Sequence, residues 1–574
     1  MNKNLQLVSW EVINIVSQGL KESHSSQSRI FTTLIVALAL TSIFILPFSN
    51  LDPIFIPKFA ILCPTILYLV LNLSKTSLKH FSKIEAMILM SFLLMVSIST
   101  VVGPRPILDK VFGEYRRGNG LLFWLSILGV YLICRSFSNP RSNWLFFRAF
   151  WLVVGINSIY GLIQIHNLDP IPWTYRGEPI GFLGNSNFLT SFAAIGASSG
   201  LPFLFERQNK LFLRLSLLSL VLMSIYLSVS SGSIQGILVL TISLLACLLF
   251  LSIEGRLGSL KPKLVLSLSF LGLLAVAIML PRIPKLYSSY SINQRIDYML
   301  AGMRLIHESP LIGVGLDSFA DFYPKYRSID AAKRPGAAFT DSAHSVPIDL
   351  WISGGFFFFA VFMAFVVMIL KSAFIKLKLT KKCSTFEFAS FLVFLGFLVQ
   401  AVISINHVVM GMWAFGAAGI IQAPSLVVNS GRQKNGRNSA MPTLSKQGKG
   451  QISSKVIRQA IAVSVSSLLF FVIFASLSKD SNLRFALQQD RPDEVLNVME
   501  HWPKLKYHYV FASLVLTERE RDDLAIVLAR DAIKTYPGDI DLLNVITNND
   551  FATFSEKLLA KSKLKLLDPK NFSE

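Results

Sequence analysis

Residues 346–370 have the sequence VPIDLWISGGFFFFAVFMAFVVMIL, an apolar run with one charged side chain, Asp349. An α-helix needs about 20 apolar residues to cross the hydrocarbon core of a bilayer, so this run predicts a transmembrane helix. Similar runs predict further spans at 30–48, 54–73, 86–102, 120–135, 145–165, 187–206, 211–230, 233–252, 264–281, 386–405, 408–428 and 456–477. The chain is therefore predicted to be an all-α, polytopic integral membrane protein with about 12–13 transmembrane helices.

The composition supports this class. Of the 574 residues, 52% are hydrophobic and 16% are charged, and the mean hydropathy is +0.53. A soluble domain usually has about 25% charged residues, and a disordered chain has fewer apolar ones, so both classes are excluded. The four cysteines form no CxxC pair, which argues against a disulfide framework and against a zinc site.

The distribution of charge predicts an orientation. The chain has 55 Lys+Arg and 34 Asp+Glu, a formal net charge of +21. The basic residues lie mostly in short loops between apolar runs, which is the positive-inside pattern and predicts no binding to nucleic acid. With a cytoplasmic N-terminus, these loops lie inside. The loop 103–119 is the exception, because Arg105, Lys110, Arg116 and Arg117 then lie outside, where basic side chains often bind an anionic group.

The predicted spans divide the chain into parts. In chain order these are a cytoplasmic N-terminal segment (1–29), a transmembrane core (30–428) with a large outside loop (282–345), a flexible cytoplasmic linker (429–455), an additional span (456–477) and an outside helical tail (478–574). The linker is assigned from its content of Ser, Gly, Asn and Lys.

The tail has the pattern of amphipathic helices. Residues 523–546 read DLAIVLARDAIKTYPGDIDLLNVI, in which Ala525 and Ala529 are small and Pro537 starts a new helix. The stretch resembles a tetratricopeptide repeat, with a weaker partner at 483–500. The alternative is a generic helical hairpin. A repeat-like tail predicts protein partners for this part of the chain.

The outside loop 282–345 contains most of the candidate chemistry. Arg295 and Arg304 are nine positions apart, which places them on opposite faces of a continuous helix at about 100° per residue. The stretch from Gly313 to Gly315 lacks the third glycine and the βαβ setting of a dinucleotide site, so it predicts a tight turn instead.

His344 lies where the outside loop meets the apolar run at 346–370. Histidine is the side chain best suited to take a proton near neutral pH, so His344 is a candidate general base at the membrane surface. The alternative is a structural histidine that caps the helix or is hydrogen-bonded to the loop. The residue type alone leaves both roles open.

Several stretches resemble the O-antigen ligase/polymerase superfamily of polytopic glycan transferases. They are Arg295, PLIGVGLDSF at 310–319, Ala343-His344-Ser345 before a helix with Gly354-Gly355, EYRRGNGL at 114–121 and GFLGNSNF at 181–188. The resemblance covers roughly residues 30–428. The chain departs from the pattern of the superfamily at Ser345 (usually Asn), Tyr298 (often Trp) and Ser231-Gly232-Ser233 (commonly Ser-Arg-Gly).

The resemblance implies transfer of a glycan from a polyprenyl-diphosphate carrier at the inner membrane of a bacterium, with the outside loop and the tail in the periplasm. The implied acceptor is lipid A-core, another glycan or a protein. The superfamily needs no metal, and no other cofactor is expected.

The chemistry of this reaction suggests roles for individual residues. The leaving diphosphate needs cationic hydrogen-bond donors, and the planar fork of arginine suits phosphate oxygens. The candidate catalytic residues are His344, as the base, and Arg295. The candidate substrate-binding residues are Arg116, Arg117, Arg304, Glu114 and Asp341.

Structural roles are the alternatives for these side chains. Arg116 and Arg117 could instead contact lipid headgroups. Arg295 could form an ion pair within the loop, with Asp297 or Glu308.

Other functions compete with transfer to a final acceptor. A polymerase would add repeat units to a carrier-bound glycan. A transporter of a small anion such as bicarbonate is a further alternative, but it predicts charges at mid-membrane and an internal repeat, and the sequence shows few such charges and no clear repeat. A scaffold that recruits partners through the tail is the third alternative, and this role is compatible with catalysis.

Overall fold

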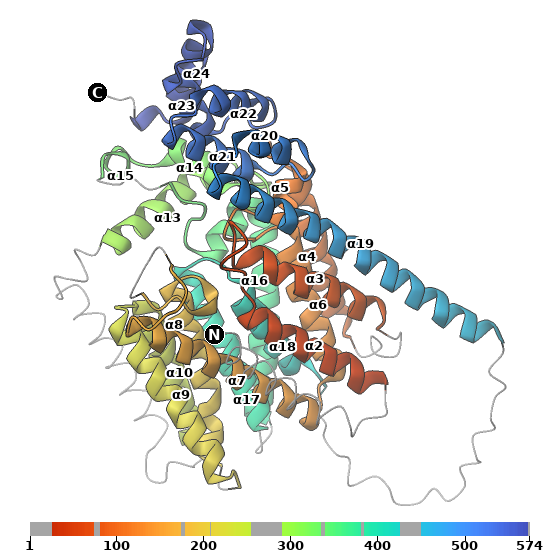
Figure 1. Cartoon of the computed structure of the whole chain (residues 1–574). Coiled ribbons are helices and arrows are strands. Elements are labelled where there is room, and N and C mark those ends of the chain that lie inside the picture. Colours follow the sequence, from red (N-terminus) through yellow and green to blue (C-terminus); the bar gives the residue numbers. More distant parts are fainter. Residues whose placement is uncertain are drawn as a thin grey trace, which may run out of the picture.

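The computed structural model describes residues 26–73, 81–173, 178–206, 208–253, 290–334, 339–379, 384–424 and 449–571. Within these ranges the regular elements are helices and no strand occurs, which confirms the predicted all-α class. The helices form a bundle with a helical tail at one end (Figure 1). We call the end that carries the tail the outer end and the opposite end the inner end.

The bundle corresponds closely to the predicted spans. Its helices are α2 (Ser26–Ile43), α3 (Phe55–Leu71), α4 (Lys83–Val101), α6 (Leu121–Phe137), α7 (Pro140–Ile165), α8 (Ser186–Leu204), α9 (Leu211–Ser230), α10 (Ile234–Ile253), α16 (Val346–Leu379), α17 (Thr385–Ile403), α18 (Val408–Gln422) and α19 (Lys449–Gln488). Seven helices of the described ranges are long and apolar enough to cross a membrane, and α2, α3, α6 and α18 are shorter apolar helices. The predicted span 264–281 lies outside the described residues, as do most of the N-terminal segment and of the linker.

Neighbouring helices of the bundle are antiparallel. At the inner end, the start of α4 meets the end of α6, where Arg135 forms a buried ion pair with Glu85 at 3.0 Å. At the outer end, Ser99 near the end of α4 accepts a hydrogen bond through its carbonyl from the amide of Leu316 at 2.7 Å. Loops therefore alternate between the two ends, as in a multi-pass membrane protein.

The core of the bundle lies around α18, which is buried from Val408 to Ile421. A helix that is apolar on all sides is expected in the interior, and small residues allow close helix approach there. A Cβ on Gly419 would lie 2.5 Å from the Tyr131 carbonyl oxygen of α6. Peripheral helices instead expose apolar side chains, for example Phe212 of α9 at 82%.

Helix α16 bends where the sequence has two adjacent glycines. Gly354 (φ −137°, ψ 18°) and Gly355 (φ 68°, ψ −168°) are not helical. The bend frees the carbonyls of Ile352 and Ser353, which accept hydrogen bonds from the amides of Val314 at 2.8 Å and Gly315 at 3.1 Å. The outside loop is thus held against α16.

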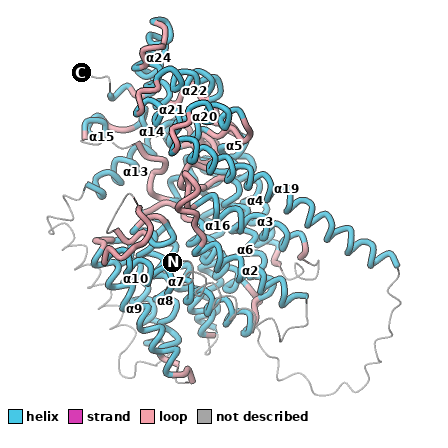
Figure 2. The backbone as a smooth tube through the Cα atoms, viewed as in Figure 1, coloured by secondary structure: helices cyan, strands magenta, loops and turns pink. Residues whose placement is uncertain are grey.

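The outer end consists of short helices and loops beneath the tail. The loop elements are α5 (Ile107–Phe112), η1 (Gly181–Leu183), α13 (Tyr290–Glu308), α14 (Phe319–Tyr326) and α15 (Ile329–Lys333). The tail elements are α20 (Pro492–Glu500), α21 (Lys506–Glu518), α22 (Asp522–Thr535), α23 (Ile540–Asn548), α24 (Phe554–Leu567) and η3 (Pro569–Asn571). Figure 2 shows the loops gathered between the bundle and the tail.

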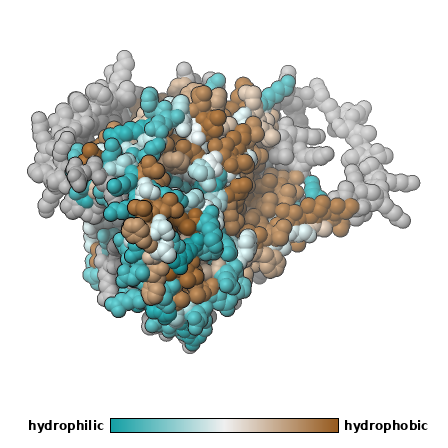
Figure 3. Space-filling view, turned by 90° about the horizontal axis from the view of Figure 1, so that it is seen from above, coloured by the Kyte–Doolittle hydropathy of each residue, from teal (hydrophilic) through white to brown (hydrophobic). Residues whose placement is uncertain are grey.

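Helix α19 joins the bundle to the tail without a break. It has 40 residues and continues past the predicted boundary at 477/478 as far as Gln488. In the view onto the tail, hydrophobic side chains extend along the projecting part of α19, and hydrophilic ones gather over the tail (Figure 3). The helices of the tail pack as antiparallel neighbours, and their assignment to tetratricopeptide repeats stays a prediction.

The tail is fixed to the outer loops by buried polar contacts. Asp480 of α19 accepts a hydrogen bond from the amide of Asp52 at 2.9 Å. Arg327, after α14, forms an ion pair with Asp568 at 2.6 Å, and both side chains are 2% exposed. The tail and the outside loop therefore form one packed unit at the outer end.

Candidate active site at the outer end

His344 lies in a short turn that is held by the first turn of α16. The residue has a positive φ of 55°. Its amide donates to the hydroxyl of Ser342 at 2.9 Å, and that hydroxyl donates to the carboxylate of Asp349 at 2.6 Å. The amide of Ala343 donates to the other carboxylate oxygen of Asp349 at 2.8 Å. Asp349 thus fixes the backbone that carries the imidazole.

The imidazole of His344 is neutral in this environment. Its ring stacks on the ring of Tyr298 of α13 at a centroid distance of 5.2 Å. Its Nδ1 is buried and has no hydrogen-bond partner in the described part of the chain. Burial, and then the positive charges of Arg117 and Arg295, lower the pKa of His344 to about 3. The imidazole is therefore unprotonated over the physiological pH range.

Arg295 extends from α13 toward the outer ends of α10 and α17. When the amide of Gln235 presents its oxygen, that oxygen accepts from both Nη1 and Nη2 of Arg295 at 3.1 Å and from the hydroxyl of Ser404 at 3.3 Å. Burial lowers the pKa of Arg295. The guanidinium of Arg295 thus contacts the neutral amide of Gln235.

The carboxylates proposed as alternative partners of Arg295 are bound elsewhere. Asp297 pairs with Arg334 at 3.2 Å. Glu308 lies 3.8 Å from Lys325. Within the described ranges, Arg295 thus has a neutral amide partner and no ion pair, which leaves its charge available for an anion.

Two motifs of the sequence analysis meet beside Gln235. The hydroxyl of Ser233 donates to the side chain of Asn187 at 2.9 Å, and Thr190 donates to Ser233 at 2.7 Å. Asn187 lies at the start of α8, in the GFLGNSNF stretch, and Ser233 lies in the polar break between α9 and α10. These hydrogen bonds join the start of α8 to the start of α10, where Gln235 contacts Arg295.

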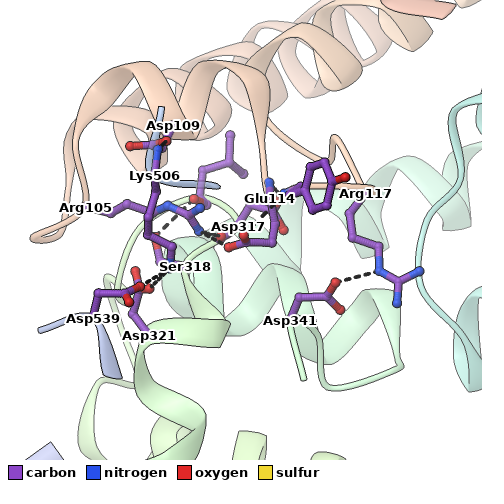
Figure 4. Close-up of polar contacts among 12 residues, drawn as sticks. Arg105, Asp109, Glu114, Arg117, Asp317, Ser318, Asp321, Asp341, Lys506 and Asp539 are labelled. Carbon is purple, nitrogen blue, oxygen red and sulfur yellow. Dashed lines mark hydrogen bonds and ion pairs between the residues drawn. The ribbon is translucent and has the colours of Figure 1, made fainter. Parts of the chain in front are cut away.

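Arg117 approaches His344 from the other side. Its Nε donates to the carboxylate of Asp341 at 2.7 Å, and both side chains are partly exposed, at 26% and 20% (Figure 4). Arg116, next to it, is exposed, and its guanidinium lies 5.1 Å from the centre of the Tyr115 ring. Arg117 and Asp341 are therefore brought to the site, whereas Arg116 points away from it.

The remaining basic residues of the loop 103–119 have structural contacts. Arg105 is buried, pairs with Glu114 at 2.7 Å and donates to the carbonyl oxygen of Asp317 at 2.6 Å. The ammonium group of Lys110 donates to the carbonyl oxygen of Val102 at 2.7 Å. Glu114, predicted to bind substrate, is thus largely engaged in a buried ion pair.

This buried ion pair belongs to a network that reaches the tail (Figure 4). Lys506, at the start of α21, binds Asp321 at 2.7 Å and Asp539 at 3.4 Å, and its amide donates to Asp109 at 3.0 Å. The amide of Glu114 donates to the carboxylate of Asp317 at 2.6 Å. Burial raises the pKa of Asp317 to about 7. We call these residues, with Arg105, the interlock network.

Arg304 and the two loop glycines lie away from His344. Arg304 is exposed on the face of α13 opposite Arg295 and donates to the carbonyl oxygen of Tyr326 at 2.8 Å. Gly313 and Gly315 have positive φ angles of 73° and 107°. These angles are those of a tight turn that favours glycine.

A cavity of about 420 Å³ lies between the outside loop and the tail. His344, Arg117, Asp341 and Tyr298 line one wall. The opposite wall comes from α21 and the start of α23. A cavity of this size is within the range of ligand sites, which is about 300–1,000 Å³.

Within the described ranges, no group of three or more His, Cys, Asp and Glu side chains is arranged to hold a metal ion. Metal independence therefore stays a prediction. The site presents a neutral imidazole, two arginines and a cavity.

Comparison with known families assigns the centre of this site. Residues 217–363 match the family described as O-antigen ligase. This match confirms the resemblance to the O-antigen ligase superfamily predicted from the sequence. The match includes Gln235, Arg295 and His344, and it does not include Arg117 or the tail. No curated protein matches the chain.

The family match defines the general activity. It supports glycan transfer of the ligase or polymerase kind by an enzyme with a lipid-linked donor and an acceptor. With the apolar helices, it also identifies a multi-pass membrane protein.

Several residues of the site were missed from the sequence. Gln235 lies two residues after the Ser231-Gly232-Ser233 stretch, but its contact with Arg295 joins segments that are distant in sequence. Asp349 is the one charged residue of the run 346–370, and a charge within a predicted span was an available signal. Lys506 gave no signal, because a lysine at a helix start is ordinarily exposed.

Proposed function

We propose that this protein transfers a glycan from a lipid-linked diphosphate donor to a hydroxyl group of an acceptor at the outer end of the bundle, without a metal. The observation that supports this most strongly is the neutral, partly buried imidazole of His344, which feels the charges of two arginines and lines the 420 Å³ cavity. A neutral base beside cationic groups suits a reaction that removes a proton and expels a diphosphate.

The proposed step balances as a single displacement. His344 takes the proton of the acceptor hydroxyl, and the acceptor oxygen forms a bond with the anomeric carbon of the donor sugar. The bond between that carbon and the phosphate oxygen breaks, and its electron pair leaves with the diphosphate. Arg295 stabilises the negative charge on the leaving group.

The two arginines divide the site into two sides. Arg295 lies over the ends of α10 and α17, next to the membrane-facing bundle, so the diphosphate of a lipid carrier reaches it first. Arg117 lies toward the tail and is partly neutralised by Asp341. We place the donor on the Arg295 side and the acceptor on the tail side.

The low pKa of His344 fits activation by the donor. A base with a pKa of about 3 is weak, and the positive charges of Arg117 and Arg295 contribute to that value. A diphosphate bound to Arg295 neutralises the charge of Arg295 and so raises the pKa of His344. The imidazole thus becomes a better proton acceptor when the donor is bound.

The test is a surface-glycan profile on gels from bacteria that express the wild-type chain, His344→Ala or Arg295→Gln at matched levels. Arg304→Gln is the matched control, because it removes an exposed arginine from the opposite face of the same helix. We expect both site variants to lose the long glycan and to accumulate carrier-linked chains. We expect the control to keep the wild-type profile.

The same profile separates the ligase from the polymerase. Long chains that accumulate on the carrier indicate a loss of transfer to a final acceptor. Single repeat units on the carrier indicate a loss of polymerisation. An unchanged profile in His344→Ala contradicts the proposal, and uptake of a small anion is then the function to assay.

A further inference from the structure

Helix α21 presents apolar side chains on two sides. Tyr509, Ala512 and Leu516 are buried in the core of the tail. Val510 and Phe511 pack against the edge of this core and also line the cavity, and both are partly buried. A helix on the surface of a domain usually has one apolar face, so the second face indicates a ligand site or an interface.

The start of α23 adds polar groups to the same wall. Asp539 caps the helix by accepting from the amide of Leu542 at 3.0 Å. Asp541, in the first turn, lines the cavity and has no hydrogen bond or ion pair to the described part of the chain. Burial, and then the charge of Asp539, raise the pKa of Asp541 to about 6. The carboxyl group of Asp541 therefore has no hydrogen-bond donor among the described residues, and a ligand in the cavity could supply one.

The other charges of this wall are balanced within the protein. Lys506 is held by Asp321 and Asp539, at 2.7 and 3.4 Å. Arg117 is held by Asp341. The tail side of the cavity therefore offers no free cation for a phosphate, and it suits a neutral ligand with many hydroxyl groups.

We propose that Val510, Phe511, Leu514, Ile540 and Asp541 form a subsite, here called the tail subsite, that binds a sugar residue of the acceptor. The apolar side chains contact the C–H face of the sugar ring, and Asp541 accepts hydrogen bonds from its hydroxyl groups. The tail is then part of the active site. This inference rests on the proposed glycan transfer.

The position of the tail subsite fits the acceptor. The same cavity is lined by His344 and Arg117, so a sugar bound against α21 directs its hydroxyl groups toward the proposed base. The donor diphosphate, in contrast, is assigned to Arg295, which does not line this cavity. Two ligands can therefore approach His344 from opposite sides.

Photo-crosslinking in the full-length chain tests the occupant. p-Benzoylphenylalanine replaces Phe511 or, as a control, Phe551, an aromatic residue of the tail that is 62% exposed and does not line the cavity. After irradiation of membranes from the glycan-producing bacterium, we expect an adduct that contains carbohydrate and no carrier lipid at position 511 only. An adduct with carrier lipid, an adduct with a protein, or no carbohydrate above the control overturns the tail subsite.

Substitutions test its contribution in the same cells. Phe511→Ala and Asp541→Ala should each lower the amount of transferred glycan about threefold to tenfold, since one such contact contributes about 0.5–1.5 kcal/mol. Phe511→Tyr, which keeps the ring, should retain transfer, and so should Phe551→Ala. Expression level and the pattern of limited proteolysis show whether each variant folds.

The two proposals can fail separately. If His344→Ala loses transfer but Phe511→Ala keeps it, the tail subsite is wrong and the catalytic assignment stands. If His344→Ala keeps transfer, the proposed function itself is wrong, whatever is cross-linked at position 511.

Discussion

The conformation of His344 is unusual for its residue type and has an identifiable support. A left-handed backbone costs a residue other than glycine about 1–2 kcal/mol. Asp349 accepts hydrogen bonds from Ser342 and Ala343, the two residues before His344, and each bond contributes about 1 kcal/mol. Ser345, where the superfamily usually has asparagine, follows directly. The first turn of α16 therefore determines where the imidazole lies.

The charge of Arg117 should contribute to the acidic limit of activity, after the burial of His344. Arg117→Gln removes one cause of the low pKa of His344, so that pKa rises from about 3 toward 6.5. Because the base must be neutral, the fraction of active enzyme then falls at a higher pH than in the wild type. We expect the acidic limb of the transfer rate in isolated membranes, measured from about pH 4 to 8, to move upward.

Arg304→Gln is the control for this pH profile, because Arg304 binds a backbone carbonyl on the other face of α13. Its acidic limb should coincide with that of the wild type. If the limb of Arg117→Gln also stays in place, the field of Arg117 does not act on the base and the electrostatic argument fails.

For single residues, the sequence identifies candidate functional side chains better than it identifies the groups they contact. Helical periodicity correctly separated Arg295 from Arg304, and the location of His344 before an apolar run identified it as a candidate base. The positive φ of His344, the contact of Arg295 with Gln235 and the ion pair of Glu114 with Arg105 could not be predicted. The contact of Arg295 with Gln235 joins segments that are distant in sequence. The other two features depend on the folded geometry of their loops.

Among the elements, the loop 310–316 and the bend of α16 form one structure. The bend exposes two carbonyls, and the loop supplies the amides that bind them. The amide of Phe356 also donates to the carbonyl oxygen of Pro310 at 2.8 Å. The adjacent glycines of α16 and the glycines of the loop therefore depend on each other. The stretches 310–319 and Gly354-Gly355, which resemble the superfamily, form one backbone junction.

Gly313 tests this junction. A Cβ on Gly313 would lie 2.3 Å from the Ile352 carbonyl oxygen, whereas a Cβ on Gly232 would meet nothing within 4 Å, and both residues have a positive φ. Gly232→Ala should therefore lower the free energy of unfolding only by the cost of a left-handed backbone at alanine, about 1–2 kcal/mol. Gly313→Ala should cost clearly more, because the backbone of α16 must also move.

The measurement is the thermal unfolding midpoint of the purified full-length chain, together with glycan transfer. We expect Gly313→Ala to unfold at a lower temperature than Gly232→Ala and to lose transfer. Equal unfolding midpoints for the two variants would show that the backbone of the junction accommodates the Cβ at little cost, so that the junction does not position the site.

The sequence predicts the positions of the membrane helices well and the ends of those helices less well. Twelve predicted spans coincide with helices of the described residues, because a membrane requires long apolar helices. The predicted boundary at 477/478 does not coincide with a helix end, since α19 continues to Gln488. Hydropathy marks where a helix leaves the bilayer, but it gives no signal for where the helix ends.

For the whole molecule, the chemistry is concentrated at one end. His344, both arginines of the site, the interlock network and the cavity lie in the outer loops and against the tail. Figure 1 shows the tail at this end of the bundle. The exposed lysines Lys210 and Lys371 lie at the inner end. The sequence predicted this asymmetry from the charge of the loops. The docking of the tail required the folded structure, because it depends on single buried pairs such as Arg327 with Asp568.

This asymmetry predicts which end faces which compartment. Unpaired basic loops remain in the cytoplasm, so the inner end should be cytoplasmic and the outer end should lie on the trans side, where carrier-linked glycans are transferred. Single cysteines test this at Glu308 and Asp550 of the outer end, which are 54% and 91% exposed in their side chains, and at Lys210 and Lys371 of the inner end. Cys63, Cys134 and Cys247 are buried, and the unsubstituted chain supplies the baseline.

A membrane-impermeant maleimide should label Glu308→Cys and Asp550→Cys in spheroplasts with intact membranes. It should label Lys210→Cys and Lys371→Cys only after the membrane is permeabilised. The reverse pattern would place His344 and the tail in the cytoplasm and exclude transfer on the trans side. Labelling of both ends in intact spheroplasts would show that the bundle does not separate the two ends, which contradicts the assignment of its apolar helices as transmembrane spans.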